Sequence, residues 1–215
     1  MAITAKDKGG DIELIPAETQ HGVCYSIIDI GTQPSNNPQF RPKHQVIFTW
    51  EIPMLRIKLE SDGKLANLPR AISRTMTLSL STKSNMRPML VSWRGRDFTE
   101  QELEGFDISK IAGANALLTI VHEKKNDKTY ANVAAVSKIM KGMPVLKPEN
   151  PVCIFSIEDI NGKISIPPNI PDWIKAKIMQ SDEWHARMGD QGHQPDSVQN
   201  EDNVYPNTED ESVPF

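Results

Sequence analysis

The alternation of apolar and polar residues along the chain predicts a mainly β protein. Short segments rich in β-branched and aromatic residues are separated by loops that contain proline, glycine or asparagine. The alternation is clearest at residues 71–80, where Ile72, Met76 and Leu78 fall on one side and serines and threonines fall on the other. We expect strands at residues 21–31, 44–52, 71–80, 114–122, 129–137 and 152–157.

Three further segments have features of helices. The apolar residues of the first recur every three or four positions: Met86, Met89, Leu90 and Trp93. We expect this helix at residues 85–93, with Ser84 as its N-cap. Thr99 and Glu102 have the spacing of a capping box, which predicts a second short helix. Pro171 precedes a third helix, expected from residue 173 to about 188.

Three strands, a helical insert and two more strands occur in this order in OB-folds. We therefore expect an OB-fold-like, five-stranded Greek-key barrel with a helical insertion between strands three and four, followed by a C-terminal helix. Residues 1–188 would form this domain with its C-terminal helix, and residues 189–215 a disordered acidic tail. A generic β-barrel or an α+β domain fits the same order. Cys24 and Cys153 lie in apolar runs typical of buried free thiols.

Charge is distributed unevenly along the chain. Residues 190–215 contain seven acids and no Lys or Arg, a formal charge of −7, whereas the rest carries 24 basic and 21 acidic residues. Residues 38–98 hold 11 basic residues against 4 acids. We expect a cationic surface on the body and an acidic arm, which would be attracted to basic partners and to the basic surface of the body itself.

Aromatic residues lie among these basic residues. An unpaired strand exposes phosphates, which attract Lys and Arg, and base faces, which stack on flat rings. The sequence therefore predicts binding of single-stranded DNA without strong sequence preference. The candidate contacts are Phe40, Arg41, Lys43, Trp50, Arg56, Lys58, Arg70, Arg74, Lys83, Arg87, Trp93, Arg94, Arg96, Lys124, Lys125, Lys128 and Tyr130. For Trp50 a place in the core is the competing interpretation, and Trp93 can equally anchor its helix.

The last residues of the sequence combine acids with an apolar tip. The matching positions are Asp210, Glu211, Val213, Pro214 and Phe215. They resemble the C-terminus of bacterial single-stranded DNA-binding proteins, in which acids are followed by Ile-Pro-Phe; Ser212 departs from that pattern. The resemblance implies that the tip docks replication, recombination and repair proteins. An acidic tail that only aids solubility is the competing interpretation.

Motifs in the body resemble a group of phage-type single-stranded DNA-binding proteins. They are Ser84-Asn85-Met86, the run from Trp93 to Thr99, Gly105-Phe106-Asp107, and the run from Thr129 to Val133. The resemblance implies an OB-fold core that acts in phage or prophage DNA metabolism, in the cytoplasm of a bacterial host. The oligomeric state stays open, a homo-oligomer included.

Motifs for catalysis are not found in the sequence. It contains no Walker A, GxGxxG, GxSxG, CxxC or HExxH pattern, so we expect no enzyme activity, no cofactor and no metal. Glu123-Lys124-Lys125, with Asp107 before it, loosely matches the acidic-x-Lys core of metal-dependent nucleases, which is the least favoured alternative. RNA binding or recombination mediation by the same barrel is the nearer one.

The sequence also predicts no association with a membrane. No run approaches the roughly 20 apolar residues that a spanning helix needs. The first ten residues lack the apolar core of a secretory signal.

Overall fold

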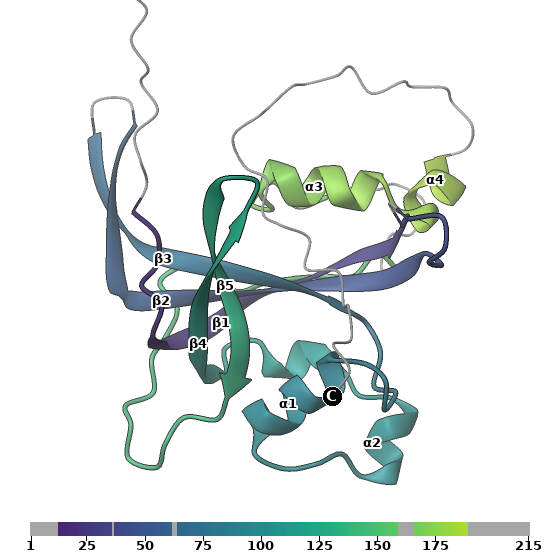
Figure 1. Cartoon of the computed structure of the whole chain (residues 1–215), viewed down its shortest axis with the longest axis horizontal. Coiled ribbons are helices and arrows are strands. Elements are labelled where there is room, and N and C mark those ends of the chain that lie inside the picture. Colours follow the sequence, from purple (N-terminus) through teal and green to yellow (C-terminus); the bar gives the residue numbers. More distant parts are fainter. Residues whose placement is uncertain (1–12, 36, 62–63, 159–165, 189–215) are drawn as a thin grey trace, which may run out of the picture.

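The computed structural model describes residues 13–35, 37–61, 64–158 and 166–188, and the side chains of residues 59–65 are not described. The chain is mainly β, as predicted, with short helices between and after the strands (Figure 1). The elements in chain order are β1 (Thr19–Gln33), β2 (Lys43–Ser61), β3 (Lys64–Thr77), α1 (Met86–Arg94), α2 (Glu100–Glu104), the 3-10 helix η1 (Ile108–Ile111), β4 (Asn115–Lys125), β5 (Lys128–Ser137), β6 (Cys153–Phe155), α3 (Asp172–Met179) and α4 (Asp182–Met188).

The strands form one six-stranded sheet. Five of them follow the order β3-β2-β1-β4-β5, and each neighbouring pair is antiparallel. The short strand β6 pairs with β1 in parallel. Within the described residues no strand ladder joins β3 to β5, so the sheet is open there, and the expected closed five-stranded barrel is not observed. The two end strands still approach each other, because Arg74 Nη1 of β3 donates a hydrogen bond to the Ala134 carbonyl of β5 at 3.2 Å.

The sheet is covered on both faces, as Figure 1 shows, with α1 and α2 on one side and α3 and α4 on the other. Successive residues of a strand point to opposite faces. In β2, Phe48 and Trp50 therefore join the core beneath α1, while Ile47 joins a second core beneath α3. We call these the α1 core and the α3 core. Both contain residues without exposed surface, so each face of the central strands is covered over part of its length.

The helices between β3 and β4 form as predicted. The apolar stripe of α1 is buried, and the helix ends at Gly95, which adopts a left-handed φ of 71°. Ser84 Oγ accepts from the Met86 amide at 3.2 Å, although the N-cap position itself is Asn85. Both hydrogen bonds of the predicted Thr99–Glu102 capping box are present at the start of α2.

Two predicted boundaries are wrong. We expected Pro53 to end the second strand, but β2 continues through it, because a register shift between Ile52 and Arg56 leaves the proline outside the ladder. Beyond this bulge β2 pairs with β3, and the two strands form a long ribbon that extends past β1. The third strand accordingly begins at Lys64 rather than at Ala71.

The expected single C-terminal helix is divided into α3 and α4. The break lies at Ser181, which is fully buried. Its Oγ donates to the Ile178 carbonyl at 2.7 Å and accepts from the Trp184 amide at 3.2 Å. A serine that bonds backbone groups in both directions ends one helix and caps the next.

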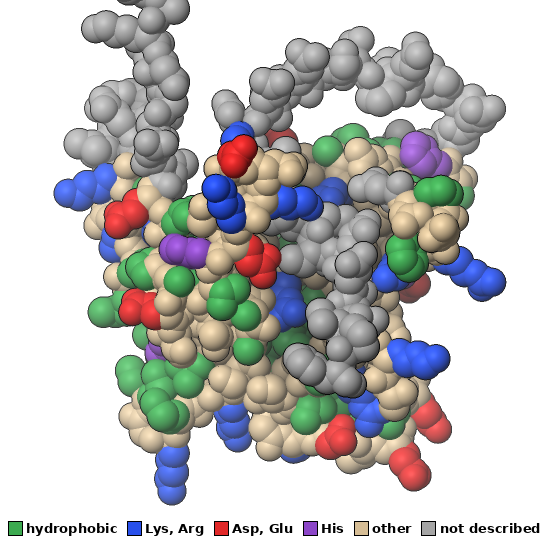
Figure 2. Space-filling model, viewed as in Figure 1, with side chains coloured by type: hydrophobic (Ala, Val, Ile, Leu, Met, Phe, Trp, Pro, Cys, Tyr) green, Lys and Arg blue, Asp and Glu red, His purple; other side chains and the backbone are tan. Residues whose placement is uncertain are grey.

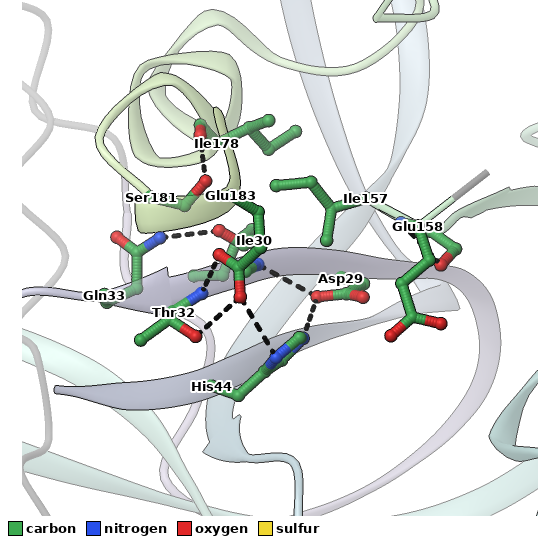
Figure 3. A network of polar contacts seen from close by, with 12 residues as sticks. Asp29, Ile30, Thr32, Gln33, His44, Ile157, Glu158, Ile178, Ser181 and Glu183 are labelled. Atoms are coloured by element: carbon green, nitrogen blue, oxygen red, sulfur yellow. Dashed lines mark hydrogen bonds and ion pairs between the residues drawn. The ribbon is translucent and has the colours of Figure 1, made fainter. Parts of the chain in front are cut away.

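A polar network attaches α4 to the sheet (Figure 3). Glu183 accepts hydrogen bonds from the Thr32 amide at 2.7 Å and from the Thr32 hydroxyl at 2.6 Å. His44 Nε2 lies 2.7 Å from Asp29 Oδ1, and its Nδ1 lies 3.5 Å from Glu183 Oε1. Gly31 in β1 permits this close approach, because a Cβ there would lie 2.6 Å from Glu183 Oε2.

The two cysteines are free thiols, as predicted. Cys24 is buried in the α1 core, and burial raises its pKa to about 12. Cys153 is only half-buried. Of the helices in the described ranges, none is long and apolar enough to cross a bilayer.

Candidate nucleic-acid interface

The loop between β1 and β2 presents three of the predicted contacts to solvent. Phe40 is 48% exposed, and Arg41 and Lys43 are also exposed. The Phe40 amide donates to the Asn37 carbonyl at 3.0 Å, which closes a turn just before the basic residues. An exposed ring beside two cations can stack on a base while the cations meet phosphates.

The β4–β5 hairpin forms a second basic site. Its turn residues Asn126 and Asp127 have positive φ values of 47° and 63°, as a tight two-residue turn requires. The three lysines around the turn are exposed: Lys124, Lys125 and Lys128. Figure 2 shows Lys and Arg side chains at the tip of this hairpin. Tyr130 is half-buried on β5.

The β2–β3 ribbon contains the next group of candidates. They differ in exposure and in whether their charge is already paired within the protein. Lys58 is exposed. Arg56 forms an ion pair with Glu149 and a hydrogen bond with Asn67, so its charge is already partly neutralised. Arg70 is half-buried.

Three other candidates lie in the loop before α1, on α1 itself and on β3. Lys83 is exposed in the loop before α1. Arg87 on α1 lies 3.5 Å from Asp97. Arg74 is half-buried and connects β3 to β5 through the Ala134 carbonyl, so it stabilises the approach of the end strands.

The structure contradicts Trp50 and Trp93 as contacts with DNA. Trp50 is 0% exposed and Trp93 is 4% exposed. Their ring centroids are 5.6 Å apart in the α1 core, and Trp93 Nε1 donates to the Asn115 carbonyl at 2.8 Å. A base cannot reach these rings while the core stays packed. The competing interpretation, that Trp50 fills the core and Trp93 anchors its helix, is confirmed.

Arg94 is also unsuitable as a contact with a phosphate. Its guanidinium lies 4.3 Å from the ring centroid of Phe98 and 4.6 Å from that of Phe106, and it forms an ion pair with Glu102. Arg96 is more exposed, and its Nη2 lies 2.8 Å from Glu102 Oε1. Hydrogen bonds from Arg96 and from the Thr99 backbone lower the pKa of Glu102 to about 2. These charges hold α1 to α2, and Arg94 is not available to a ligand.

The acids of the nuclease alternative have structural partners. Asp107 Oδ1 accepts from the amide of Ser109 at 3.0 Å and from its hydroxyl at 2.5 Å, which caps η1. Glu123 accepts from Asn132 at 2.7 Å. In the part of the chain that the structure describes, no group of three or more His, Cys, Asp or Glu residues could hold a metal ion. The predicted partner-binding tip, Asp210 to Phe215, lies outside the described residues.

The sequence did not reveal an open cavity of about 310 Å³ on the α3 side of the sheet. Strands β1, β2 and β3 contribute Tyr25, Thr49 and Ser73, the segment before β6 contributes Asn150, and α3 contributes Trp173. Tyr25 and Trp173 are half-buried. Tyr25 follows the buried Cys24 in β1, so its side chain points to the other face of the sheet. Nothing in the sequence indicates that it lies near Trp173, 148 positions later.

The cavity is held in shape by a buried carboxylate and a hydroxyl pair. Glu51 is 0% exposed and accepts from the amides of Glu149 and Asn150, at 2.8 and 2.9 Å, and from Asn150 Nδ2 at 2.6 Å. Thr49 Oγ1 and Ser73 Oγ are 2.9 Å apart. The connector before β6 is therefore fixed to β2 beside the cavity.

Comparison of the chain with family models, with curated proteins and with solved structures found no match. The resemblance to phage-type single-stranded DNA-binding proteins therefore remains a prediction from its motifs. Function has to be inferred from the strand order and the side chains described above.

Proposed function

We propose that this protein binds single-stranded DNA without strong sequence preference, in phage or bacterial DNA replication, recombination or repair. The observation that supports the proposal is the strand order. The path β3-β2-β1-β4-β5, with α1 between β3 and β4, has the connectivity of an OB-fold whose last contact, β3 to β5, is made by a side chain instead of a ladder. OB-folds bind oligonucleotides on the face of strands 2 and 3 and with the loops between strands 1 and 2 and between strands 4 and 5.

Exposed basic residues lie on both of those loops. The β1–β2 loop offers Arg41 and Lys43 beside Phe40, and the β4–β5 hairpin offers its three lysines. A phosphate backbone that spans the two loops would release counterions, so its affinity would fall as salt rises. Of the predicted contacts, Phe40, Arg41, Lys43, the three hairpin lysines, Lys58, Arg70, Lys83 and Tyr130 keep their proposed role. Four arginines already have a partner within the fold and could bind a phosphate only in competition with it: Arg56, Arg74, Arg87 and Arg96. Trp50, Trp93 and Arg94 lose their proposed role.

The test is an anisotropy titration of labelled oligo-dT and of a matched duplex at two salt concentrations. We expect tighter binding of the single strand and a steep loss of affinity with salt. Equal binding of the duplex, or no binding of oligo-dT in dilute buffer, would contradict the proposal. Competition with an RNA oligonucleotide of the same sequence separates DNA binding from the RNA-binding alternative.

The hairpin lysines provide a quantitative version of this test. If Lys124, Lys125 and Lys128 each meet one phosphate, changing all three to Ala should reduce the slope of log K against log salt by about 2. Lys110 on η1 and Lys141 in the segment after β5 are exposed and serve as the control when changed to Ala. An unchanged slope in the hairpin variant would remove this loop from the interface.

We also propose that the acidic tip recruits partner proteins. The support is the sequence Asp210-Glu211-Ser212-Val213-Pro214-Phe215, in which two acids precede apolar side chains. An apolar pocket on a partner would accept the ring of Phe215, and basic residues around that pocket would pair with the acids. Deletion of Phe215 should abolish docking of replication or recombination proteins in a pull-down and leave the affinity for oligo-dT intact. Retention of the same proteins without Phe215 would rule out this role.

A further inference from the structure

We propose that the cavity beside α3 binds an unpaired nucleobase. This inference rests on the proposed function and assigns residues that the sequence did not reveal. The cavity lies on the α3 side of β1, β2 and β3, opposite the α1 core. It includes strands β2 and β3, which contribute to the binding face of OB-folds. It is built jointly by those strands, the segment before β6 and the start of α3.

The chemistry of the lining favours a base over a phosphate. Among the described residues that line the cavity, none has a Lys, Arg, His, Asp or Glu side chain. A phosphate would find no cation there, whereas a flat neutral ring would find an indole, a phenol, hydroxyls and amides. The indole belongs to Trp173 and the phenol to Tyr25, and Asn150 and Asn169 supply the amides.

The size and shape of the cavity agree with such a ligand. Its volume of about 310 Å³ is at the lower end of the range of small-molecule pockets. The side chains of Thr49, Ile170 and Ile174 that line it are almost fully buried, whereas Ala71 is exposed, so the cavity runs from solvent to the α3 core. Bases of a single strand can turn outward into a cavity of this kind, and bases stacked within a duplex cannot.

The walls are fixed before any ligand arrives. Glu51 holds Asn150 through its amide group and its backbone, and the α3 core holds Ile170 and Ile174 beneath Trp173. Preformed walls reduce the entropy that binding would otherwise cost. The site is therefore distinct from the lysines of the hairpin, which would bind the backbone of the strand.

The first experiment combines Trp173→Ala with an abasic oligonucleotide. Affinities of wild type and variant are measured for oligo-dT and for an abasic strand of equal length, which keeps the phosphates and lacks the bases. We expect the variant to bind oligo-dT roughly 5- to 150-fold more weakly, because one base stacked on an aromatic ring contributes that much. For the abasic strand we expect the two proteins to bind equally. An equal loss on both strands, or no loss on either, would overturn the inference.

The second experiment measures tryptophan fluorescence. It replaces Trp173 by Phe, which removes less side-chain volume than replacement by Ala. Trp50 and Trp93 are buried, so quenching by oligo-dT reports mainly on the half-buried Trp173 and Trp184. We expect Trp173→Phe to remove the quenching and the matched control Trp184→Phe to retain it. Quenching that follows Trp184 instead would place the base elsewhere.

A third variant tests the cavity from an exposed position. Ala71→Leu narrows the opening without removing a core contact, and it should weaken binding of oligo-dT but not of the abasic strand. If oligo-dT binds tightly in anisotropy titrations while the Trp173 and Ala71 variants behave as wild type, the inference of a base pocket is wrong and the proposed function stands. If wild type does not bind oligo-dT, the proposed function itself fails.

Discussion

At the scale of single residues, buried and half-buried polar groups determine how the C-terminal third is attached to the sheet. Glu51 is fully buried and bonds the connector before β6. Glu183 of α4 is half-buried, accepts from Thr32 of β1 and lies 3.5 Å from His44 of β2. Buried carboxylates persist only where hydrogen bonds satisfy them, which these residues achieve with backbone and side-chain donors. The attachment of the connector before β6 and the attachment of α4 to the sheet therefore depend on a few ionisable side chains.

We expect Glu51→Ala to lower the free energy of unfolding by about 2–4 kcal/mol, because three donors lose their acceptor on a fully buried carboxylate. Urea unfolding measures this loss. Glu51→Gln keeps one side-chain oxygen as an acceptor and should lose less. An unchanged urea midpoint for the alanine variant would show that the connector is held by other contacts.

His44 should make the attachment of α4 sensitive to pH. The hydrogen bond to Asp29 raises the pKa of His44 against the opposing effect of burial, and the charges of Asp29, Glu183 and Glu158 raise it further. The folded state therefore binds the proton more tightly than the unfolded state. This contribution to stability is complete below about pH 6.5 and is lost as the pH rises through the raised pKa.

The measurement is the thermal midpoint between about pH 6 and pH 8, compared between wild type and His44→Gln. The difference between them should shrink as the pH rises. Burial tends to raise the pKa of Glu183, but the hydrogen bonds from Thr32 outweigh it and the pKa is lowered. The ionised Glu183 carboxylate therefore stabilises the fold at a pH above its ordinary pKa. That contribution is lost as the pH falls through the lowered pKa. A difference that is constant with pH would contradict the role of His44.

The residue scale also marks the limit of what the sequence could predict about the site. The alternation of side chains along a strand puts Phe48 and Trp50 on the same face of β2, but it does not say that this face is covered. Burial depends on which distant segment packs there, and here α1 does. The same limit applies to Arg94, whose cage of Phe98 and Phe106 forms only after the loop beyond α1 folds back.

At the scale of elements, α4 is seated on β1 by a glycine. Gly31 has a φ of 73°, and a Cβ there would lie within 2.9 Å of Glu183, Ser181 and Ile157. The position therefore needs glycine both for its backbone and for the space beside it.

We expect Gly31→Ala to displace α4 as well as to strain the backbone. Gly113→Ala is the matched control, because Gly113 has a similar φ of 81° with nothing within 4 Å of the added Cβ. The control should lose only about 1–2 kcal/mol from the left-handed backbone. The Gly31 variant should lose more and should show faster hydrogen exchange in α4. Equal effects of the two substitutions would show that crowding at Gly31 is unimportant.

The element scale was predicted well where local signals are strong. The α1 stripe, the Thr99–Glu102 box and the strands β4 and β5 all follow from short-range patterns. Two features did not follow from the sequence. The bulge that carries β2 past Pro53 depends on pairing with β3, and Ser181, where the helix divides, is buried beside Gly31 of β1.

At the scale of the whole molecule, opposite charges separate along the sequence. The last 26 residues carry a net charge of −7, and residues 38–98 carry a net charge of +7. Opposite charges attract over roughly 10 Å at moderate salt and over longer distances in dilute buffer. The acidic arm would then compete with DNA for the basic loops.

Removal of residues 189–215 should therefore tighten binding of oligo-dT at low salt, and the effect should fade as salt rises. Anisotropy titrations of the full chain and of the shortened chain measure this difference. A tail of equal length with Asn and Gln in place of its acids is the control, and it should behave like the deletion. Unchanged affinity at low salt would count against self-competition.

The two cores share a single sheet, which limits how far the molecule can be trimmed. Ile28, Ile30 and Ile47 have no exposed surface only because residues beyond β5 lie over them. A chain that ended after Ser137 would expose a row of apolar side chains on the paired strands, and such exposed surfaces favour aggregation. The shortest fragment that still binds an oligonucleotide should therefore extend at least to the end of α4.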